Sequence, residues 1–214
     1  MDISDYRREY TQTGLSRATL LASPFAQFEL WFKQACEVDI VDANAMTLAT
    51  VSTTGLPSVR TVLLKTFDHT GFIFFTNYHS QKAQQIAENP QVALLFPWTE
   101  LERQIEITGT AEKISKEESL AYFSSRPEGS QLGAWASRQS DVIDNREALE
   151  QRWQSIEKRF QHGTIPFPDF WGGYRVVPEK IEFWQGRVNR LHDRFEYYRD
   201  HQEKDHWKIS RLAP

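Results

Sequence analysis

Three short apolar segments, separated by tight turns, restrict the fold of this chain more than any other feature. Residues 46–52, 59–65 and 72–76 are rich in Val, Leu, Ile, Phe and Thr, as β-strands are. The turns at 53–55 and 68–71 leave too few residues for the long crossover that parallel strands require. We therefore expect an antiparallel meander.

The remaining segments add further strands and helices. Apolar spacing and capping residues predict helices over 24–37, after a cap at Ser80, from the capping box at 115–118, and over 144–161. Strands are expected at 92–96, buried on both faces, and at 101–111, 174–177, 180–185 and 190–198, with 206–212 as a further candidate. About eight strands without βαβ alternation predict an α+β, mainly β fold, a barrel or closed sheet with peripheral helices.

Composition and charge exclude several classes of protein. The formal net charge of −4 and a pI near 5.9 argue against nucleic-acid binding. The single cysteine, Cys36, excludes an internal disulfide framework, and the six histidines lack the spacing of metal ligands, so no metal site is expected. No signal peptide or membrane-length apolar run is present, which predicts a cytoplasmic protein without a membrane partner.

A cationic cluster near the C-terminus is the first sign of function. Arg187, Arg190, His192 and Arg194 fall within eight residues of an acidic protein. In an extended strand, Arg190, His192 and Arg194 would share one face and repel one another unless an anion lay between them. Because a guanidinium group matches the geometry of phosphate, we expect a phosphorylated ligand here. The alternative is a solvated edge strand.

Four other places carry anion-binding groups. They are Arg60 with Lys65, the helix start at Gln81 and Lys82, the set Tyr122, Arg126 and Ser130 around Pro127, and the neutral groups of Gln104, Gln139 and Ser140. An offset of five sends Arg60 and Lys65 to opposite strand faces unless a bulge intervenes. Free N–H groups at a helix start favour phosphate. Each set alone also suits a solvated surface, but together they predict a site for two phosphorylated, planar ligands.

Several sequence blocks together resemble one known family. They are residues 60–65, 94–98, 125–127, 171–173, 182–194 and 207–214. Their combination is similar to the pyridoxine/pyridoxamine 5′-phosphate oxidases, over nearly the whole chain. The resemblance implies an FMN-binding split β-barrel, with a mobile arm or lid at residues 1–19 and a single domain at 20–214. It also implies a homodimer with its active sites at the subunit interface.

The resemblance further implies an activity and a set of residues. The chain would oxidise pyridoxine 5′-phosphate and pyridoxamine 5′-phosphate to pyridoxal 5′-phosphate, with dioxygen as acceptor and hydrogen peroxide as product. FMN would be bound by Arg60, Lys65, Phe75, Thr76, Gln81, Lys82, Gln104, Gln139, Ser140, Trp184 and Arg194. The substrate would be bound by Arg7, Tyr10, Lys65, Tyr122, Arg126, Ser130, Arg190 and His192. Arg190 and His192 would be the catalytic pair beside the pyridine ring.

Gln81 departs from the family pattern, and two other functions compete with this one. Many family members carry Arg where this chain has Gln81, so one charged contact worth about 1.5–3 kcal/mol is lost. The rivals are a phenazine-pathway oxidase of the same barrel family and a non-catalytic binder or carrier of flavin or pyridoxal phosphate. The Tyr122, Arg126 and Ser130 set favours a phosphorylated substrate.

Overall fold

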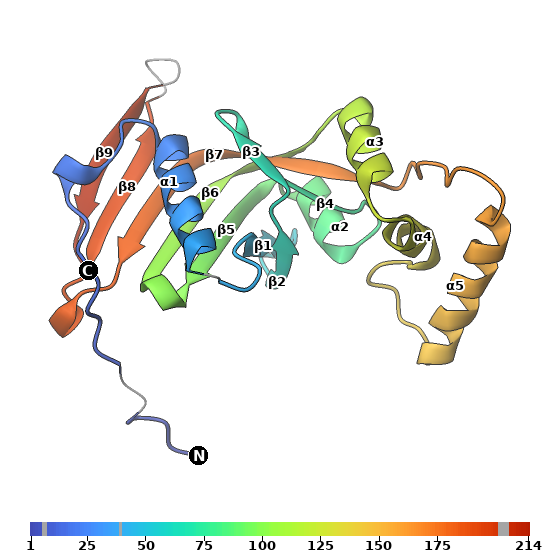
Figure 1. Cartoon of the computed structure of the whole chain (residues 1–214), viewed down its shortest axis with the longest axis horizontal. Coiled ribbons are helices and arrows are strands. Elements are labelled where there is room, and N and C mark those ends of the chain that lie inside the picture. Colours follow the sequence, from blue (N-terminus) through green and yellow to red (C-terminus); the bar gives the residue numbers. More distant parts are fainter. Residues whose placement is uncertain (6–7, 39, 201–205) are drawn as a thin grey trace.

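The computed structural model describes residues 1–5, 8–38, 40–200 and 206–214, and within them one curled sheet carries five α-helices (Figure 1). The strands are β1 (Ala45–Val51), β2 (Pro57–Leu63), β3 (Thr66–Asp68), β4 (Gly71–Asn77), β5 (Gln91–Trp98), β6 (Arg103–Lys113), β7 (Trp171–Gln185), β8 (Asp193–Arg199) and β9 (Trp207–Leu212). The helices are α1 (Pro24–Glu37), α2 (Gln81–Glu88), α3 (Lys116–Ser125), α4 (Glu128–Ala136) and α5 (Arg146–Phe160). None of the helices in these ranges combines the length and apolarity needed to span a membrane.

The sheet curls until its two edges meet. Its strands are all antiparallel in the order β2-β1-β5-β6-β7-β4-β3, and β8 and β9 continue from β7. β2 and β3 end this order on opposite sides, yet only Leu64 and Lys65 separate them in the chain. The N–H of Lys65 donates to the carbonyl of Ile73 at 2.9 Å and ties this corner to β4. The expected split barrel with peripheral helices is confirmed.

Helix α1 supplies much of the barrel core. Ser23 caps it by accepting the N–H of Ala26, and Pro24 occupies the first turn, as predicted. Phe28 of α1 is fully buried, with its ring 4.9 Å from Phe72 and 5.1 Å from Phe96. Burying such a side chain contributes about 1.5–3 kcal/mol. These contacts fix α1 against the inner face of the sheet.

A second apolar cluster holds α3, α4 and α5 at the far end of the sheet (Figure 1). The capping box between Ser115 and Glu118 forms and starts α3 as expected. Pro127 then separates α3 from α4, because a proline disfavours helical geometry at the residue before it. Arg126 is therefore placed at a corner between two helices.

The strand at the centre of the sheet differs from the prediction. Residues 174–177 and 180–185 belong to one strand, β7, which continues through a shift of register between Thr108 and Gly109, opposite Pro178. A bulge accommodates the missing N–H of Pro178 without ending the strand. The expectation that 92–96 is buried on both faces is also wrong, since β5 alternates buried and partly exposed residues. β3 is a short strand that the sequence did not predict.

The bulge gives a test of the fold. A Cβ at residue 109 would lie 2.1 Å from the carbonyl oxygen of Val177, so we expect Gly109→Ala to lower the free energy of unfolding by about 1–3 kcal/mol. Gly129→Ala is the matched control, because a Cβ there meets nothing closer than 3.8 Å and alanine favours helix α4. Urea unfolding measures both variants. Equal midpoints would contradict the tight bulge.

Candidate active site

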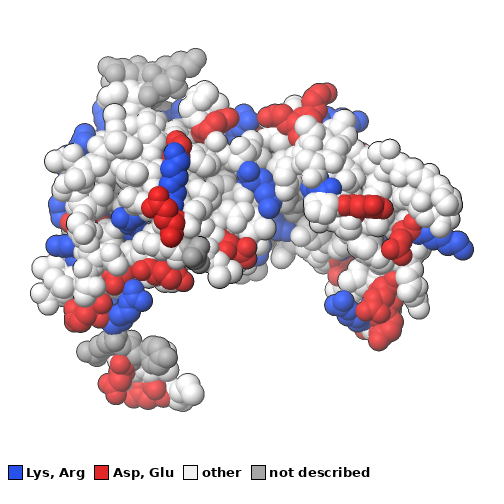
Figure 2. All heavy atoms as spheres, in the orientation of Figure 1, with Lys and Arg blue, Asp and Glu red and all other residues white. Residues whose placement is uncertain are grey.

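A cationic cavity of about 520 Å³ opens between β2, β4, α2 and α3. Its lining residues are Arg60, Thr61, Val62, Leu63, Lys65, Phe75, Thr76, Lys82, Tyr122, Arg126, Gln139 and Trp171. Four of these described residues are cations and none is acidic. Over the face shown in Figure 2, by contrast, Asp and Glu side chains are interspersed with Lys and Arg. The excess of positive charge in the cavity calls for an anionic ligand.

Lys82 and Arg60 form one charged side of this cavity. Lys82, in the first turn of α2, is only 7% exposed, and its Nζ lies 3.3 Å from Thr76 Oγ1 and 3.5 Å from Ser80 Oγ. Burial lowers the pKa of Lys82, and the nearby charge of Arg60 lowers it further. Arg60 is held in place by a hydrogen bond of 2.6 Å, which its Nη1 donates to the Thr50 hydroxyl. An anion here would relieve the repulsion between the two cations.

Arg126 lies on the other side of the cavity with an unsatisfied donor. Its Nη1 is buried and has no hydrogen-bond partner among the described residues, and its guanidinium lies 4.6 Å from the centre of the Trp171 ring. Burial lowers the pKa of Arg126, although Tyr122 raises it in part. Ser130 lines an adjoining cavity of about 240 Å³ that shares Arg126. A buried donor without a partner costs about 1–3 kcal/mol, so this corner is prepared for an acceptor.

Gln139 and Ser140 close the cavity beside the start of α2. The Oε1 of Gln139 accepts the hydroxyl of Thr76 at 3.0 Å and the N–H of Asn77 at 3.2 Å. The Ser140 hydroxyl accepts the N–H of Gln81 at 3.3 Å. These contacts bring the loop after α4 to the helix start, as a shared ligand site would require.

A second cluster of predicted residues lies at the other end of β7. In the ladder, Trp184 is paired with Gln104 of β6 and with Arg194 of β8. The Trp184 ring lies 4.5 Å from the His192 ring, and Tyr10 meets both rings edge-on at 5.7 and 5.5 Å. This cluster presents aromatic surface rather than free charge.

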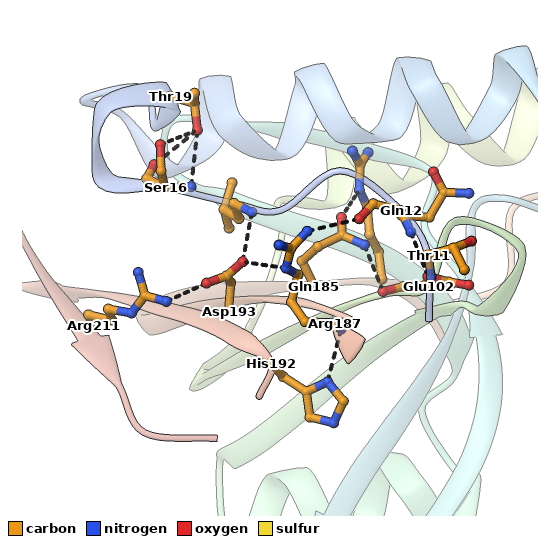
Figure 3. Close-up of polar contacts among 12 residues, drawn as sticks. Thr11, Gln12, Ser16, Thr19, Glu102, Gln185, Arg187, His192, Asp193 and Arg211 are labelled. Carbon is orange, nitrogen blue, oxygen red and sulfur yellow. Dashed lines mark hydrogen bonds and ion pairs between the residues drawn. The ribbon is translucent and has the colours of Figure 1, made fainter. Parts of the chain in front are cut away.

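The predicted common face of the C-terminal cations is wrong. β8 begins only at Asp193, and Arg190 lies in a short 3-10 helix in which Asn189 and Arg190 have φ values of 56° and 61°. Left-handed backbone at two successive non-glycine residues breaks the alternation of a strand. The loop is closed by His192, whose Nδ1 accepts the N–H of Arg187 at 3.1 Å (Figure 3). Burial, and then Arg190, lower the pKa of His192, which favours the neutral ring.

The arginines beside His192 have carboxylate partners within the protein. Arg194 donates to both carboxylate oxygens of Glu182, at 2.7 and 2.9 Å, and this bond raises the pKa of Arg194. Arg187 lies 3.6 Å from Asp193. For these two arginines, the anion expected from the sequence is therefore a carboxylate of the protein itself.

The two clusters are too far apart to form one site within one chain. Thirteen residue steps of β7 separate Trp171, in the cavity, from Trp184. At about 3.3 Å per residue, the strand between them is about 40 Å long. Figure 1 shows the start of β7 near α3 and its end beside β8, on opposite sides of the molecule. Arg7, the remaining predicted residue, lies outside the described residues.

Sequence reasoning missed Trp171 as a lining residue and missed two buried acids. Glu102 was expected on the polar side of a strand, but it follows a 3-10 helix, Thr99–Leu101, with φ 54° and 5% exposure. Asp193 is 7% exposed and accepts the N–H of Leu15. A buried acid at a turn has the same local pattern as an exposed strand residue, so no sequence signal marks either one.

The unsatisfied donor of Arg126 can be tested directly. We expect Arg126→Met to change the free energy of unfolding by less than about 1 kcal/mol, because the variant removes an unpaired buried charge. The same variant should lose the part of the rise in melting temperature that inorganic phosphate gives by binding at Arg126, and keep the part due to Arg60 and Lys82. Lys116→Met, which removes an exposed cation at the start of α3, is the control and should keep the whole rise. A full phosphate response in Arg126→Met would contradict the assignment.

Comparison with known proteins identifies relatives along the whole chain. A family model described as pyridoxamine 5′-phosphate oxidase matches residues 32–160, and a model described as the pyridoxine 5′-phosphate oxidase C-terminal dimerisation region matches 171–214. The chain is 60% identical to a pyridoxine/pyridoxamine 5′-phosphate oxidase from Crocosphaera subtropica, with all of both chains covered. It is 56% identical to a protein of the same name from Vesicomyosocius okutanii, with 100% of this chain and 99% of that one covered.

Solved structures agree with the fold. PhzG from Burkholderia lata, in complex with tetrahydrophenazine-1-carboxylic acid, superposes with a TM-score of 0.87 at 28% identity, over 95% of this chain and 99% of that one. A pyridoxamine 5′-phosphate oxidase-related, FMN-binding protein from Nostoc punctiforme has a TM-score of 0.71 at 19% identity, over 91% and 100% of the two chains, and this likeness concerns the fold. With two family models and full-length relatives in agreement, the chain belongs to the pyridoxamine 5′-phosphate oxidase family.

Proposed function

We propose that this protein is an FMN-dependent oxidase that converts pyridoxine 5′-phosphate and pyridoxamine 5′-phosphate to pyridoxal 5′-phosphate. The observation that carries the proposal is the cavity in which four cations, no acid and a buried unpaired Nη1 of Arg126 lie together. Such a cavity fits two phosphate groups better than one, since its cations lie on two sides. The full-length relatives named above support the choice of substrate.

The residues present fit both ligands. Arg60 and Lys82, with the loop of Gln139 and Ser140, would hold the phosphate of FMN at the start of α2, where helix N–H groups add to the charge. Lys65 would lie between the two ligands, and Phe75 and Thr76 would line the cofactor. The Gln81 side chain is exposed at the same helix start and would offer an amide where many relatives offer a guanidinium.

The substrate phosphate would lie on the opposite side. Tyr122, Arg126 and Ser130 converge where α3 gives way to α4, and the cavities beside them share Arg126. The Trp171 ring lies 4.6 Å from the guanidinium of Arg126 and stabilises it by a cation–π contact. A phosphate at this corner would pair the buried Nη1.

The active sites would lie at the interface of a homodimer. One chain keeps its cationic cavity and its Trp184 and His192 cluster at opposite ends of β7. A two-fold axis would place the cavity of one protomer against the aromatic cluster of its partner, and it would build two complete sites at once. Gln104, Trp184 and Arg194 would then meet FMN from across the interface.

The protein would orient the two bound ligands and control the protonation of the substrate. FMN would supply the redox chemistry, which is hydride acceptance from the C4′ carbon of the substrate and reoxidation by dioxygen to give hydrogen peroxide. Arg190, exposed on its strained turn, would place a positive charge beside the pyridine ring. The lowered pKa of His192 favours the neutral ring, and because Nδ1 accepts an N–H, Nε2 would carry the proton. This ring can donate a hydrogen bond to the substituent on C4′.

Two rival functions predict different behaviour. A relative with the same fold binds a phenazine carboxylic acid, so the fold alone does not choose the substrate. A phenazine-type oxidase would not need the Tyr122, Arg126 and Ser130 corner, and that favours a phosphorylated substrate. A carrier of flavin or pyridoxal phosphate would bind ligands without turnover.

The colour of the purified protein separates these functions. We expect yellow protein whose flavin absorbance bleaches under anaerobic conditions when pyridoxine 5′-phosphate or pyridoxamine 5′-phosphate is added. Air should restore the colour with release of hydrogen peroxide. Protein that cannot be loaded with FMN, or that stays yellow with both substrates, would rule out the oxidase.

Arg190→Leu tests the assignment of the catalytic cation. Loss of one charge that acts in the transition state typically lowers kcat about 100-fold or more. The FMN affinity should stay near that of the wild type, because Arg190 is not among the residues assigned to the cofactor. Unchanged turnover with pyridoxine 5′-phosphate would show that the assignment is wrong.

A further inference from the structure

Glu102 is a buried acid for which the mechanism above has no role. It is 5% exposed, and its backbone is left-handed, with φ 54° and ψ 38°. A non-glycine residue persists in this conformation only where its surroundings hold it there, and such residues cluster at functional positions. Glu102 lies at the end of β7 where Trp184 and His192 meet.

The carboxylate of Glu102 binds the N-terminal arm at three points. Its Oε2 accepts the N–H groups of Thr11 at 2.9 Å and Gln12 at 3.1 Å (Figure 3), and its Oε1 accepts Arg8 Nη2 at 3.1 Å. Burial raises the pKa of Glu102, but Gln12, Arg8 and Thr11 together lower it by more, so the net direction is down. An ionised carboxylate that holds two successive backbone N–H groups fixes the path of the arm.

The backbone of Glu102 is joined to the end of β7. Its carbonyl accepts the N–H of Gly186 at 2.7 Å. Gly186 in turn lies against the Tyr10 ring, since a Cβ there would be 2.8 Å from Tyr10 Cγ. Tyr10 meets Trp184 and His192 at the point where the arm is held close to Gly186.

We propose that Glu102 is a positioning residue, which docks residues 8–12 and so holds Tyr10 against Trp184 and His192 where the substrate ring binds. The proposal rests on the proposed function for the identity of the substrate. The docking of the arm by Glu102 does not depend on it. Glu102 itself touches neither ligand in this scheme.

The rest of the arm has anchors of its own. Leu15 is buried in the main core, and its N–H donates to Asp193 Oδ2 at 3.1 Å. Arg211 and Arg187 also pair with Asp193. Loss of the Glu102 carboxylate should therefore loosen residues 8–12, where the Gln12 carbonyl still accepts Arg187 Nη1 at 3.1 Å, and leave the core in place.

Glu102→Gln in the FMN-loaded protein tests the proposal by two independent readouts. Amide hydrogen exchange over residues 8–12 should become about tenfold faster or more as the arm is loosened. KM for pyridoxine 5′-phosphate should rise roughly tenfold, because apparent affinity falls with the fraction of docked arm, while kcat changes by less than about twofold. The FMN affinity should not change.

Glu100→Gln is the matched control. It removes the same charge from the same turn, but within the part of the chain that the structure describes its exposed carboxylate accepts only the Thr99 hydroxyl. Exchange and KM should match those of the wild type. Arg8→Gln leaves the buried carboxylate in place, so it should change the exchange rate and KM less than Glu102→Gln does. It replaces Glu102→Gln as the test if that variant is unstable.

A double-mutant cycle shows whether Glu102 acts through Tyr10. Tyr10→Ala should raise KM by itself, and adding Glu102→Gln to it should raise KM no further. Unchanged exchange in Glu102→Gln would show that this residue does not anchor the arm. Faster exchange with an unchanged KM, or effects that multiply, would overturn the positioning role. If the wild type did not oxidise the substrate at all, the proposed function would fail, and exchange would still decide the anchor.

Discussion

Strand β7 is the element on which the rest of the structure depends. Its fifteen residues hydrogen-bond to β6 along one side and to β4 and then β8 along the other. One stiff strand therefore carries both Trp171, in the cationic cavity, and Trp184, in the aromatic cluster. Because a strand of this length cannot fold back on itself, each chain holds two half-sites. In the proposed function, a complete site would then require a second copy.

The two half-sites differ in whether their positive charges are neutralised within the protein. Near Trp184, Arg194 is paired with Glu182, and Arg187 with Asp193, so the chain neutralises these cations itself. The cavity contains four cations and no acid among its described residues, and Arg126 has an unpaired buried donor. In the proposed function, the cavity would therefore bind the phosphate groups, while the other half would supply ring surface, the strained Arg190 and the arm held by Glu102.

Local patterns predicted most of the fold. Caps at Ser23 and Ser115 and short turns between apolar runs act over a few residues, so they can be seen in the sequence. The bulge at Pro178, the left-handed turn before His192 and the burial of Glu102 depend on strands distant in sequence, and the patterns missed them. The anion-binding groups of the cavity were recognised from their residue types, and their roles toward FMN and substrate followed from the family resemblance. The distance between these residues and Trp184 could not be predicted, because the sequence suggested two separate strands where the structure has the single strand β7.

Subunit complementation tests the central claim, that each active site combines half-sites from two chains. Arg126→Met would disable the cavity and Arg190→Leu the opposite half, so each homodimer should be inactive. In a heterodimer of the two variants, a two-fold arrangement puts both lesions in one site and leaves the other intact, so an equal mixture after subunit exchange should recover about a quarter of wild-type activity. Activity no higher than that of the separate variants would contradict an interface site. It would indicate that each site is formed within a single chain.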